Sequence, residues 1–434
     1  MAETSRGPHI GVLSSLFPSS VQPGAGLFIR ERMFRVARRL PLFVVAPTPW
    51  FPMQERFLGL LKYLAEEMYV GDTGLAARFQ KWVRRHWHAG FRLGAPEYEE
   101  QQGIPVWYPG FLSLPGILKT LDGRAMAAGA FPRFDAMRTA GRLDLIDAHF
   151  GYPDGYAAVL LGRRLGVPVT ITLRGSEVWR SRDSYLAPKL REALHGATKV
   201  FAVCESLRQL AIGMGVPDER VEVVGNGVDA GLFRPRERGA ARAALGLAPE
   251  APVLISVGWL VERKGFHRVL DVLPALIRRW PDLVYLIVGS GSLAGDNRAE
   301  LDAQVERLGL RANVRFLGAL PPEELPGPLS AADVFVLATR AEGWANVFLE
   351  AMACGLPVVT TDVGGNREVV CRPELGELVP FGEPSALEAA LEHALARSWD
   401  RAAIRRYAES NSWDGRIDRL CRVFTELTGR TIRE

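Results

Sequence analysis

Short apolar runs rich in β-branched residues alternate along the chain with longer stretches in which apolar residues recur every three or four positions. Near the N-terminus, residues 9–16 and 42–50 have the first pattern, and residues 28–40 between them have the second. A continuous or alternating apolar run predicts a strand, whereas a period near 3.6 predicts an amphipathic helix. A loop containing glycine separates the first strand from the helix, so this part of the chain predicts a parallel α/β unit.

The same alternation returns twice further along the chain. The first return predicts three strands with two helices between them, at 143–150, 156–166, 167–175, 184–197 and 199–206. The second return predicts five strands, at 253–258, 283–289, 313–318, 334–339 and 357–362. A helix is expected over residues 266–280, with a kink or an early end at Pro274, because proline lacks the N–H group that a helix interior uses.

This pattern favours two doubly wound α/β halves joined near residue 235. The 434 residues are enough for two large domains or three small ones, at roughly 100–200 residues each. We predict an N-terminal domain over 1–235 and a C-terminal domain over 236–411. The segment at about 49–116 is rich in tryptophan, arginine and other aromatic residues and interrupts the first half. An amphipathic helix at about 412–434 is expected to cross back onto the N-terminal domain.

Charge and composition exclude several classes of protein. The net charge is only +4 and there is no uninterrupted basic block, so no nucleic-acid partner is expected. The four cysteines form no C-x-x-C pair and no histidines cluster at ligand spacing, so no metal site is predicted. No window approaches about 18 apolar residues, and no secretory leader is recognised. We expect a cytoplasmic protein, with attachment to the inner face of the membrane left open.

In open α/β sheets, ligands bind beyond the carboxyl ends of the strands, where loops and helix N-termini lie. Arg263 and Lys264 follow the strand at 253–258 and come just before a helix. Two cations beside unpaired helical N–H groups suit a diphosphate. An adjacent Arg-Lys pair is also common on solvated surfaces, so the pair alone leaves both interpretations open.

The stretch RAEGWANVFLEAMACGLPVVT, residues 340–360, holds two glutamates eight positions apart. Glu342 lies in the loop that leaves a buried strand, and Gly343 permits a close approach of the backbone. Glu350 lies about one turn into the helix that starts near Asn346. Each carboxylate can accept hydrogen bonds from a pair of vicinal hydroxyls, and the N–H groups between them can face an anion. This pattern suits a sugar nucleotide, although a helix-capping carboxylate and a surface glutamate are the alternative.

The motifs ERKG, VRFLG, EGWANVFLEAMACGLPVV and TDVGGNREVV follow one another in the second half. Together they resemble the donor domain of family 4 glycosyltransferases, which are retaining enzymes of the GT-B fold, and the two glutamates match the family's E-x7-E motif. In the first half, DAHFGYPDGYAAVLLGRRLGVPVTITLRGSE resembles the acceptor domain of bacterial relatives that build exopolysaccharide or capsule. The resemblance covers nearly the whole chain apart from about 49–116. It implies a GT-B fold, with two doubly wound, Rossmann-like parallel-sheet domains facing a central cleft.

The resemblance also implies roles for residues of the second half. Arg263 and Lys264 would neutralise the donor diphosphate and stabilise the leaving nucleotide. Glu342 would hold hydroxyls of the donor sugar, and Glu350 would bind the ribose hydroxyls. The remaining donor-binding positions that it implies in this half are Gly343, Trp344, Ala345, Asn346, Val347 and Phe348, the last two through their backbone amides.

Four residues of the first half receive implied roles as well. His149 would touch the donor sugar or the reacting hydroxyl, although a histidine at the end of a strand is more often a core or capping residue. Gly24 and Gly26 would let the first loop close over the phosphates. Arg174 departs from the family pattern, since many relatives have histidine at this position, and we expect it to add a positive charge near the acceptor or the phosphates.

The implied reaction moves a sugar from a nucleotide-diphosphate donor to the hydroxyl of a glycan or lipid-linked acceptor, with retention of configuration and without a metal or other cofactor. A nucleotide-sugar epimerase and a non-catalytic sugar-nucleotide-binding subunit are the alternatives. The basic, tryptophan-containing stretch KWVRRHWHAGFR and the apolar LSLPGILKTL, at 81–92 and 112–121, favour contact with a membrane surface. An inserted helical subdomain that buries its tryptophans is the alternative for this region.

Overall fold

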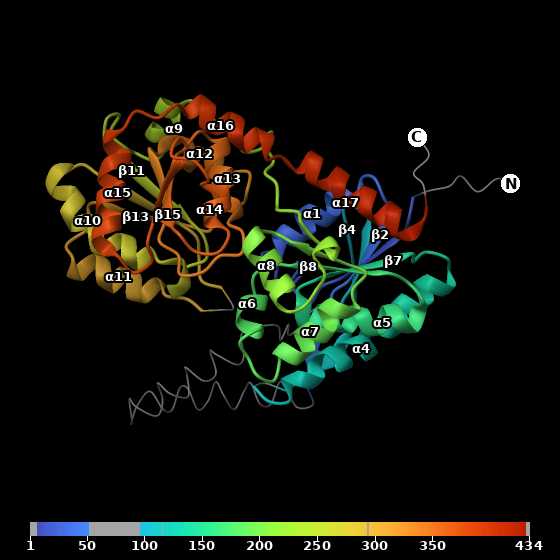
Figure 1. Cartoon of the computed structure of the whole chain (residues 1–434). Helices are drawn as coiled ribbons and strands as arrows, with labels where there is room; N and C mark the ends of the chain where they lie inside the picture. Colours follow the sequence, from blue (N-terminus) through green and yellow to red (C-terminus); the bar gives the residue numbers. More distant parts are fainter. Residues whose placement is uncertain (1–6, 52–95, 115, 293–294, 431–434) are drawn as a thin grey trace, which may run out of the picture. The chain divides into compact units, whose positions relative to one another are not determined.

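The computed structural model describes residues 7–51, 96–114, 116–292 and 295–430. Its internal contacts divide the chain into two compact units (Figure 1). Unit 1 comprises Met1–Gly225 together with Gly415–Glu434, and unit 2 comprises Asn226–Asp414. Sequence patterns placed the junction near residue 235, ten residues later. The difference arises because Val228 and Phe233 pack into a core of unit 2, and Val228 bridges to Ser412 of the same unit.

Unit 1 is built on an eight-stranded sheet in the order β10-β9-β8-β7-β1-β2-β5-β4. All neighbours are parallel except β4 and β5, and a separate parallel ribbon pairs β3 with β6. The strand bounds are β1 Ile10–Leu13, β2 Leu42–Val45, β3 Thr48–Trp50, β4 Tyr98–Gln101, β5 Ile104–Trp107, β6 Gly110–Leu112, β7 Leu145–His149, β8 Val169–Leu173, β9 Lys199–Ala202 and β10 Val221–Val223.

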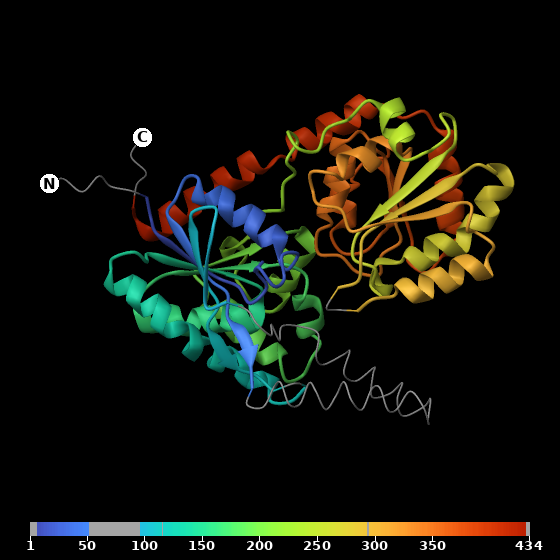
Figure 2. The same ribbon diagram turned by 180° about the vertical axis from the view of Figure 1, so that it is seen from behind.

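Helices cover both faces of this sheet, as Figures 1 and 2 show. Strands covered on both faces are buried along their whole length, and every residue of β1, β7 and β8 is buried, including Asp147 and His149 of β7. The helices of unit 1 are α1 Leu27–Ala37, α4 Asp122–Thr139, α5 Tyr156–Leu165, α6 Glu177–Arg180, α7 Ala187–Gly196 and α8 Glu205–Gly213. Short turns add η2 Lys119–Leu121, η3 Gly151–Gly155 and η4 Asp218–Arg220.

The segment at about 49–116 was predicted to be an insertion outside the α/β pattern, and its C-terminal part contradicts this. β5 continues the main sheet beside β2, and β4 closes the edge as an antiparallel strand. The sequence hid both strands because β4 reads YEEQ, which is polar as an edge strand is, and β5 contains Pro105. Residues 52–95, which include the whole of the basic, tryptophan-containing stretch at 81–92, lie outside the described residues, so the prediction made for that stretch is untested.

Unit 2 is built on a six-stranded, fully parallel sheet in the order β13-β12-β11-β14-β15-β16. The strands are β11 Val253–Val257, β12 Val284–Val288, β13 Val314–Gly318, β14 Val334–Leu337, β15 Val358–Thr361 and β16 Gly376–Val379. Alternate residues of the central strands face two separate cores. Phe335 and Leu337 of β14 pack into one core, and Val334 and Val336 pack into the other. The sheet is therefore buried on both faces, as a doubly wound sheet requires.

The helices of unit 2 are α9 Arg238–Ala244, α10 Phe266–Arg279, α11 Arg298–Arg307, α12 Pro326–Ala331, α13 Asn346–Ala353, α14 Asn366–Val369, α15 Pro384–Ala396 and α16 Arg401–Ser410, with the turn η5 Glu262–Lys264. Pro274 does not end α10, which runs on to Arg279. Leu270, Leu273 and Leu276 of this helix are fully buried in one core. This burial outweighs the lost N–H group, and an early end was the wrong expectation.

The last helix, α17 Trp413–Thr428, begins in unit 2 and continues in unit 1. There the ring of Phe424 meets that of Phe201 at 6.3 Å, and Arg419 binds the carboxylate of Glu222 through two nitrogens at 2.5 and 2.9 Å. Unit 1 is thus assembled from both ends of the chain. Within the described ranges, no helix combines the length and apolar character that crossing a bilayer requires.

Candidate functional site

Both sheets have a point where the strand order reverses, and loops at the carboxyl ends of strands gather there. In unit 2 the reversal lies at β11, which has β12 on one side and β14 on the other. In unit 1 it lies between β1 and β7. Ligands of open α/β sheets bind at such points because the exit loops diverge to opposite faces. Arg263, Lys264, Glu342, Gly24 and Gly26 follow the strands at these reversals, His149 ends β7, Arg174 follows the neighbouring β8, and Glu350 lies on α13.

In unit 2, the loops that leave β11 and β14 are joined through the Glu342 carboxylate. Lys264 Nζ donates to Glu342 Oε1 at 2.6 Å, and Arg263 Nη1 donates to the same oxygen at 3.2 Å. The hydroxyl of Thr339 donates to this oxygen at 3.2 Å as well. The backbone adds a further link, since the Arg340 N–H donates to the Arg263 carbonyl at 2.8 Å. The two cations and the first glutamate therefore form one cluster, here named the Lys264–Glu342 cluster.

Burial and charge act in opposite directions on Glu342. Burial alone would raise its pKa, but the charges of Lys264 and Arg263 and their hydrogen bonds hold the pKa below its ordinary value. The carboxylate is therefore ionised at neutral pH. The Lys264 side chain is 13% exposed and that of Arg263 is 39% exposed, so the cluster reaches the surface of unit 2 on its cationic side. An anion arriving there meets two positive charges that a buried carboxylate holds in place.

Two glycines let the backbones of this site approach closely. A side chain at Gly265, with φ +78°, would place its Cβ 1.9 Å from the Ala338 carbonyl oxygen. A side chain at Gly364, with φ +53°, would place its Cβ 1.8 Å from the Glu342 carbonyl oxygen. Neither position admits any other residue without a backbone shift. The loops after β11, β14 and β15 thus pack against one another at Glu342.

Helix α13 carries the other predicted residues of unit 2. Glu350 is half-buried on this helix, five residues in from its start. Asn346 begins the helix and its side-chain oxygen accepts from Asn226 Nδ2 at 2.9 Å. The Phe348 ring is fully buried against Phe335, at 5.7 Å between centroids.

The structure corrects one expected contact on this helix. The Phe348 N–H, which was expected to reach a phosphate or sugar, donates to the Ala345 carbonyl at 3.1 Å. A first helical turn that closes on itself leaves no N–H to offer at this position. Ala345 is buried, whereas Gly343, Trp344 and Val347 are half-buried at the start of the helix.

In unit 1, His149 ends β7 and its imidazole is fully buried. Arg174 Nη2 lies 3.0 Å from His149 Nδ1. Because arginine only donates, Nδ1 accepts and the proton of the neutral ring sits on Nε2. Burial, followed by the charges of Arg174 and Arg32, lowers the pKa of His149 well below its ordinary value. His149 is thus a neutral core histidine, and the expected contact with sugar or hydroxyl requires the groups that cover it to move.

Two buried carboxylates that sequence reasoning missed join the loops of unit 1. Glu177 is fully buried and accepts three backbone N–H groups, from Gly151 at 2.9 Å, Arg174 at 3.1 Å and Gly175 at 2.8 Å. It therefore fastens the loop after β8 to the turn after β7. Asp154 accepts from the Ser15 N–H and, at 3.1 Å, from the Ser15 hydroxyl, which fastens that turn to the loop after β1. Acidic residues in loops directly after strands were the signal available for both.

The glycine loop of unit 1 leads into α1. Gly26 has φ +68°, and a side chain there would place its Cβ 2.2 Å from the Leu16 carbonyl oxygen. The need for glycine at this position is therefore already explained by packing within the loop. Gly24 is half-buried two residues before it. The loop places the ring of Phe28 near Arg174, whose guanidinium carbon lies 5.2 Å from the ring centroid.

Each unit thus gathers its own set of predicted residues. Arg263, Lys264 and Glu342 are in direct contact in unit 2. His149 and Arg174 are in direct contact in unit 1. Within the described ranges, no group of three or more His, Cys, Asp or Glu side chains has the arrangement of a metal site.

Comparisons with known families match both halves of the chain. Residues 237–411 match the family described as Glycosyl transferases group 1, and residues 75–232 match Glycosyltransferase Family 4. A D-inositol 3-phosphate glycosyltransferase of Jonesia denitrificans is 31% identical over 305 residues, which cover 65% of this chain and 71% of the relative. A candidate teichuronic acid biosynthesis glycosyltransferase of Bacillus subtilis, TuaC, is 28% identical over 89% of both chains.

A solved structure has the same fold over nearly the full length. Anabaena Alr3699/HepE in complex with UDP-glucose aligns with a TM-score of 0.66 at 20% identity, covering 96% of this chain and 99% of that one. The predicted arrangement of two parallel-sheet α/β domains is confirmed, and the fold is GT-B.

Proposed function

Because the chain belongs to glycosyltransferase family 4 and is a glycosyltransferase, we propose that it transfers a sugar from a nucleotide-diphosphate donor to an acceptor hydroxyl with retention of the anomeric configuration. The observation that carries the proposal is the Lys264–Glu342 cluster at the strand reversal of unit 2. A binding site for a diphosphate needs fixed positive charge at the carboxyl edge of such a sheet. The UDP-glucose complex of Alr3699/HepE, a protein of the same fold, supports a nucleotide sugar as the ligand class.

The diphosphate of the donor would lie against Arg263 and Lys264, displacing part of their contact with Glu342. Glu342 would then accept from hydroxyls of the donor sugar, since it is ionised and buried beside the cations. Glu350, on the helix that follows, would accept from the ribose hydroxyls. An ionised carboxylate is an acceptor-only group and so matches hydroxyl donors.

The proposed reaction needs no protein nucleophile, metal or other cofactor. The bond between the anomeric carbon and the phosphate oxygen breaks, and the acceptor oxygen bonds to that carbon on the same face. The acceptor proton passes to the departing phosphate oxygen. Arg263 and Lys264 would stabilise the negative charge that develops on the leaving nucleoside diphosphate, which is where fixed cations contribute most to the rate.

The acceptor is proposed to be a glycan or a lipid-linked sugar of a cell-surface polymer. The name of the similar TuaC protein places it in teichuronic acid biosynthesis, and the Jonesia relative is named for an inositol phosphate acceptor. TuaC aligns over the larger share of this chain, 89% against 65%, so a polymer acceptor is favoured.

A surface of unit 1 supports a further proposal, contact with the inner face of the membrane. Trp50 and Leu112 are partners across the β3–β6 ribbon and both are 52% exposed. Ile117, Leu118 and Leu121, which follow β6, are also exposed. Lys119 and the exposed Arg124 lie in the same stretch of sequence, with Lys119 in an ion pair with Asp122 at 3.2 Å. Aromatic and aliphatic side chains together with cations suit a lipid interface, and a lipid-linked acceptor would be reached there.

Donor transfer is tested by incubating the protein with a panel of UDP-, GDP-, ADP- and dTDP-sugars and measuring release of the nucleoside diphosphate. We expect slow release from one donor, with the configuration at the anomeric carbon retained in any transfer product. Conversion of the donor into its epimer, without release, would contradict the proposal. Binding that stabilises the fold without release or transfer from any donor would also contradict it.

Membrane contact is tested by flotation with vesicles of phosphatidylcholine alone and with 30% phosphatidylglycerol. We expect co-flotation with the anionic vesicles. Vesicle partitioning should be at least about 100-fold weaker after Trp50→Ser and Ile117→Ser are combined, because burial of each side chain contributes roughly 1.5–3 kcal/mol. Absence of flotation with both vesicles would overturn this proposal and leave donor transfer unaffected.

A further inference from the structure

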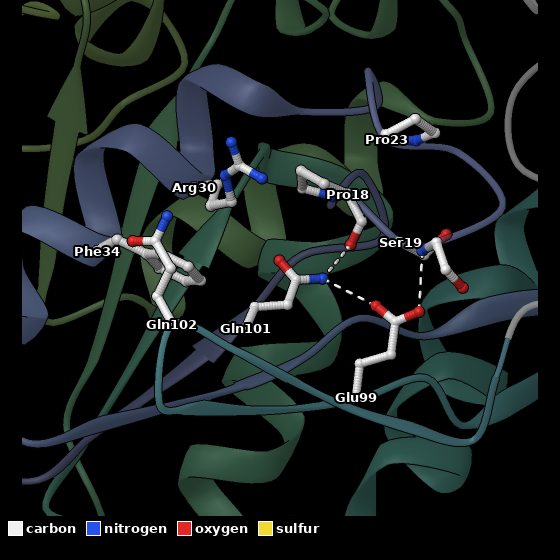
Figure 3. A pocket seen from close by; sticks show the side chains of 9 residues that line it. Pro18, Ser19, Pro23, Arg30, Phe34, Glu99, Gln101 and Gln102 are labelled. Atoms are coloured by element: carbon white, nitrogen blue, oxygen red, sulfur yellow. Dashed lines mark hydrogen bonds between the residues drawn. The ribbon is translucent and has the colours of Figure 1, made fainter.

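A pocket of about 270 Å³ lies in unit 1, where the loop after β1 passes between α1 and the β4–β5 hairpin (Figure 3). It is lined by Ser19 and neighbouring loop residues, by Arg30 and Phe34 of α1, and by Glu99 and Gln101 of β4. None of these residues belongs to the group around His149 and Arg174. The volume is just below the range of drug-sized small-molecule sites, which is roughly 300–1,000 Å³. It suits one sugar ring and is too small for a nucleotide sugar.

The amide of Gln101 is held in one orientation by acceptors on one side. Its Nε2 donates to the Pro18 carbonyl at 3.0 Å and to Glu99 Oε2 at 2.9 Å. Both are acceptors without a hydrogen of their own, so the amide nitrogen must face them and the amide oxygen must point away. Figure 3 shows this oxygen turned to the side on which Arg30 and Phe34 lie. The Gln101 side chain therefore presents a fixed acceptor.

Three residues that line the pocket each have a buried polar atom without a partner among the described residues. These atoms are Gln101 Oε1, Ser19 Oγ and Arg30 Nε. Ser19 as a whole is only 3% exposed. Buried polar atoms in folded proteins are nearly always paired with protein, water or ligand. One acceptor, one donor and one hydroxyl that can do both match a ligand that carries several hydroxyl groups.

The charge and shape of the pocket limit the chemical class of the ligand further. Glu99 accepts from the Ser20 N–H at 2.9 Å and from the Tyr108 hydroxyl at 3.1 Å, so a fixed carboxylate stands in the wall. It disfavours an acidic sugar. Arg30 Nη2 already lies 3.6 Å from Glu31, which weakens its pull on an anion. The ring of Phe34 supplies an apolar face of the kind against which the C–H groups of a pyranose ring pack.

We propose that this pocket is a binding site for one neutral sugar residue, separate from the Lys264–Glu342 cluster and from His149 and Arg174. The proposal rests on the transferase function in one respect only, which is the source of the sugar: it would be a residue of the acceptor glycan. Binding itself does not require a donor or turnover. The experiment below therefore distinguishes failure of this proposal from failure of the transferase proposal.

The test is isothermal titration of the full chain, without donor, with the methyl glycosides of glucose, galactose, mannose and N-acetylglucosamine. Free monosaccharides and methyl glucuronide are titrated in parallel. We expect saturable, millimolar binding of one neutral glycoside, with methyl glucuronide binding more weakly. Ser19→Ala and Arg30→Met should each weaken it about three- to ten-fold, as loss of one hydrogen bond does. A glycoside that binds better than the free sugar identifies the ligand as a residue of a chain.

Matched controls are Arg38→Met, which changes an exposed arginine just after the same helix, and Ser410→Ala in unit 2. Neither control should change the affinity or the donor-dependent release of nucleoside diphosphate. Two results would overturn the proposal. One is no binding of any neutral glycoside, and the other is binding that Ser19→Ala and Arg30→Met leave unchanged.

Discussion

The two units place charged groups at the strand reversals of similar sheets, yet they hold those groups differently. In unit 2, Lys264 and Arg263 meet one carboxylate and keep part of their surface exposed. In unit 1, His149 is fully buried, and Glu177 is buried among backbone N–H groups. A charge that reaches the surface can change partners when a ligand arrives, whereas a carboxylate that accepts three backbone N–H groups cannot leave without unpairing them.

Charged residues therefore have two different physical roles in the two units. The Lys264–Glu342 cluster is suited to bind and to exchange partners, so its loss should affect turnover first. The buried carboxylates of unit 1 hold loops in place, so their loss should affect folding first. Four substitutions or conditions test this division.

The largest effect is expected from Lys264→Met. Loss of a fixed cation from a site where phosphate charge develops should lower donor turnover at least about 100-fold. Release of nucleoside diphosphate from the best donor measures it, with Arg311→Met, on an exposed turn, as the control. Turnover within a few-fold of the unsubstituted protein would mean that Lys264 only balances the charge of Glu342.

Glu177→Gln should lower the stability of unit 1 by about 3 kcal/mol, because an amide group cannot accept from all three N–H donors. Urea unfolding followed by fluorescence measures the change. Glu192→Gln on the exposed face of α7 is the control and should alter stability little. If Glu177→Gln abolished turnover with stability unchanged, the carboxylate would belong to the chemistry and the division between units would fail.

Gly364→Ala should cost about 2 kcal/mol in unit 2 and weaken donor binding, since its methyl group would meet the Glu342 carbonyl. Gly382→Ala is the matched control, because Gly382 also has a positive φ but nothing lies within 4 Å of its Cβ position. Thermal unfolding and donor titration compare the two. Equal losses of stability in the two variants would mean that backbone strain alone causes the effect and that the contact with the Glu342 carbonyl contributes nothing.

The smallest effect is an opposite response of buried carboxylates in the two units to pH. Burial raises the pKa of Asp147 and Asp154 to about 6, against an ordinary value of 3.8. The folded state then binds protons that the unfolded state does not, so each of these groups adds about 1 kcal/mol to the stability of unit 1 as the pH falls from 7 to 5. His149 acts in the opposite direction, because its lowered pKa keeps the folded imidazole neutral while the unfolded chain takes up a proton below about pH 6.5. The pKa of Glu342 is lowered, so its stabilisation of unit 2 is present above pH 4.5 and lost as the pH falls through that lowered pKa.

Hydrogen exchange of β7 and β14, corrected for intrinsic rates, measures the two units separately. Asp154→Asn should lower the protection of β7 more at pH 5 than at pH 7, relative to the unsubstituted protein, because the variant lacks one of the two proton-linked gains. The same comparison should show no dependence on pH in β14. An equal change in β14, or a change in β7 that does not depend on pH, would contradict the assignment of raised and lowered pKa values to separate units.

Sequence patterns predicted the strands and helices of both sheets wherever a period was long and apolar. They also predicted that Arg263 and Lys264 lie in a loop at the carboxyl edge of the unit 2 sheet, because the loops after parallel strands gather at that edge. They failed for β4 and β5, whose residues are too few and too polar to show a period. The ligand-binding roles assigned to Arg263, Lys264, Glu342, Glu350 and the other site residues stay predictions.

The amino-acid sequence by itself determined the two α/β units and the segments that carry their charged residues, since both follow from local periodicity and from loops next to strands. Only the tertiary structure decided which charges meet. It paired Glu342 with Lys264 across 78 positions of the chain, buried His149 behind Arg174, and aimed the Gln101 amide into a pocket. Such contacts join loops from distant strands, and their geometry depends on packing that no local pattern contains.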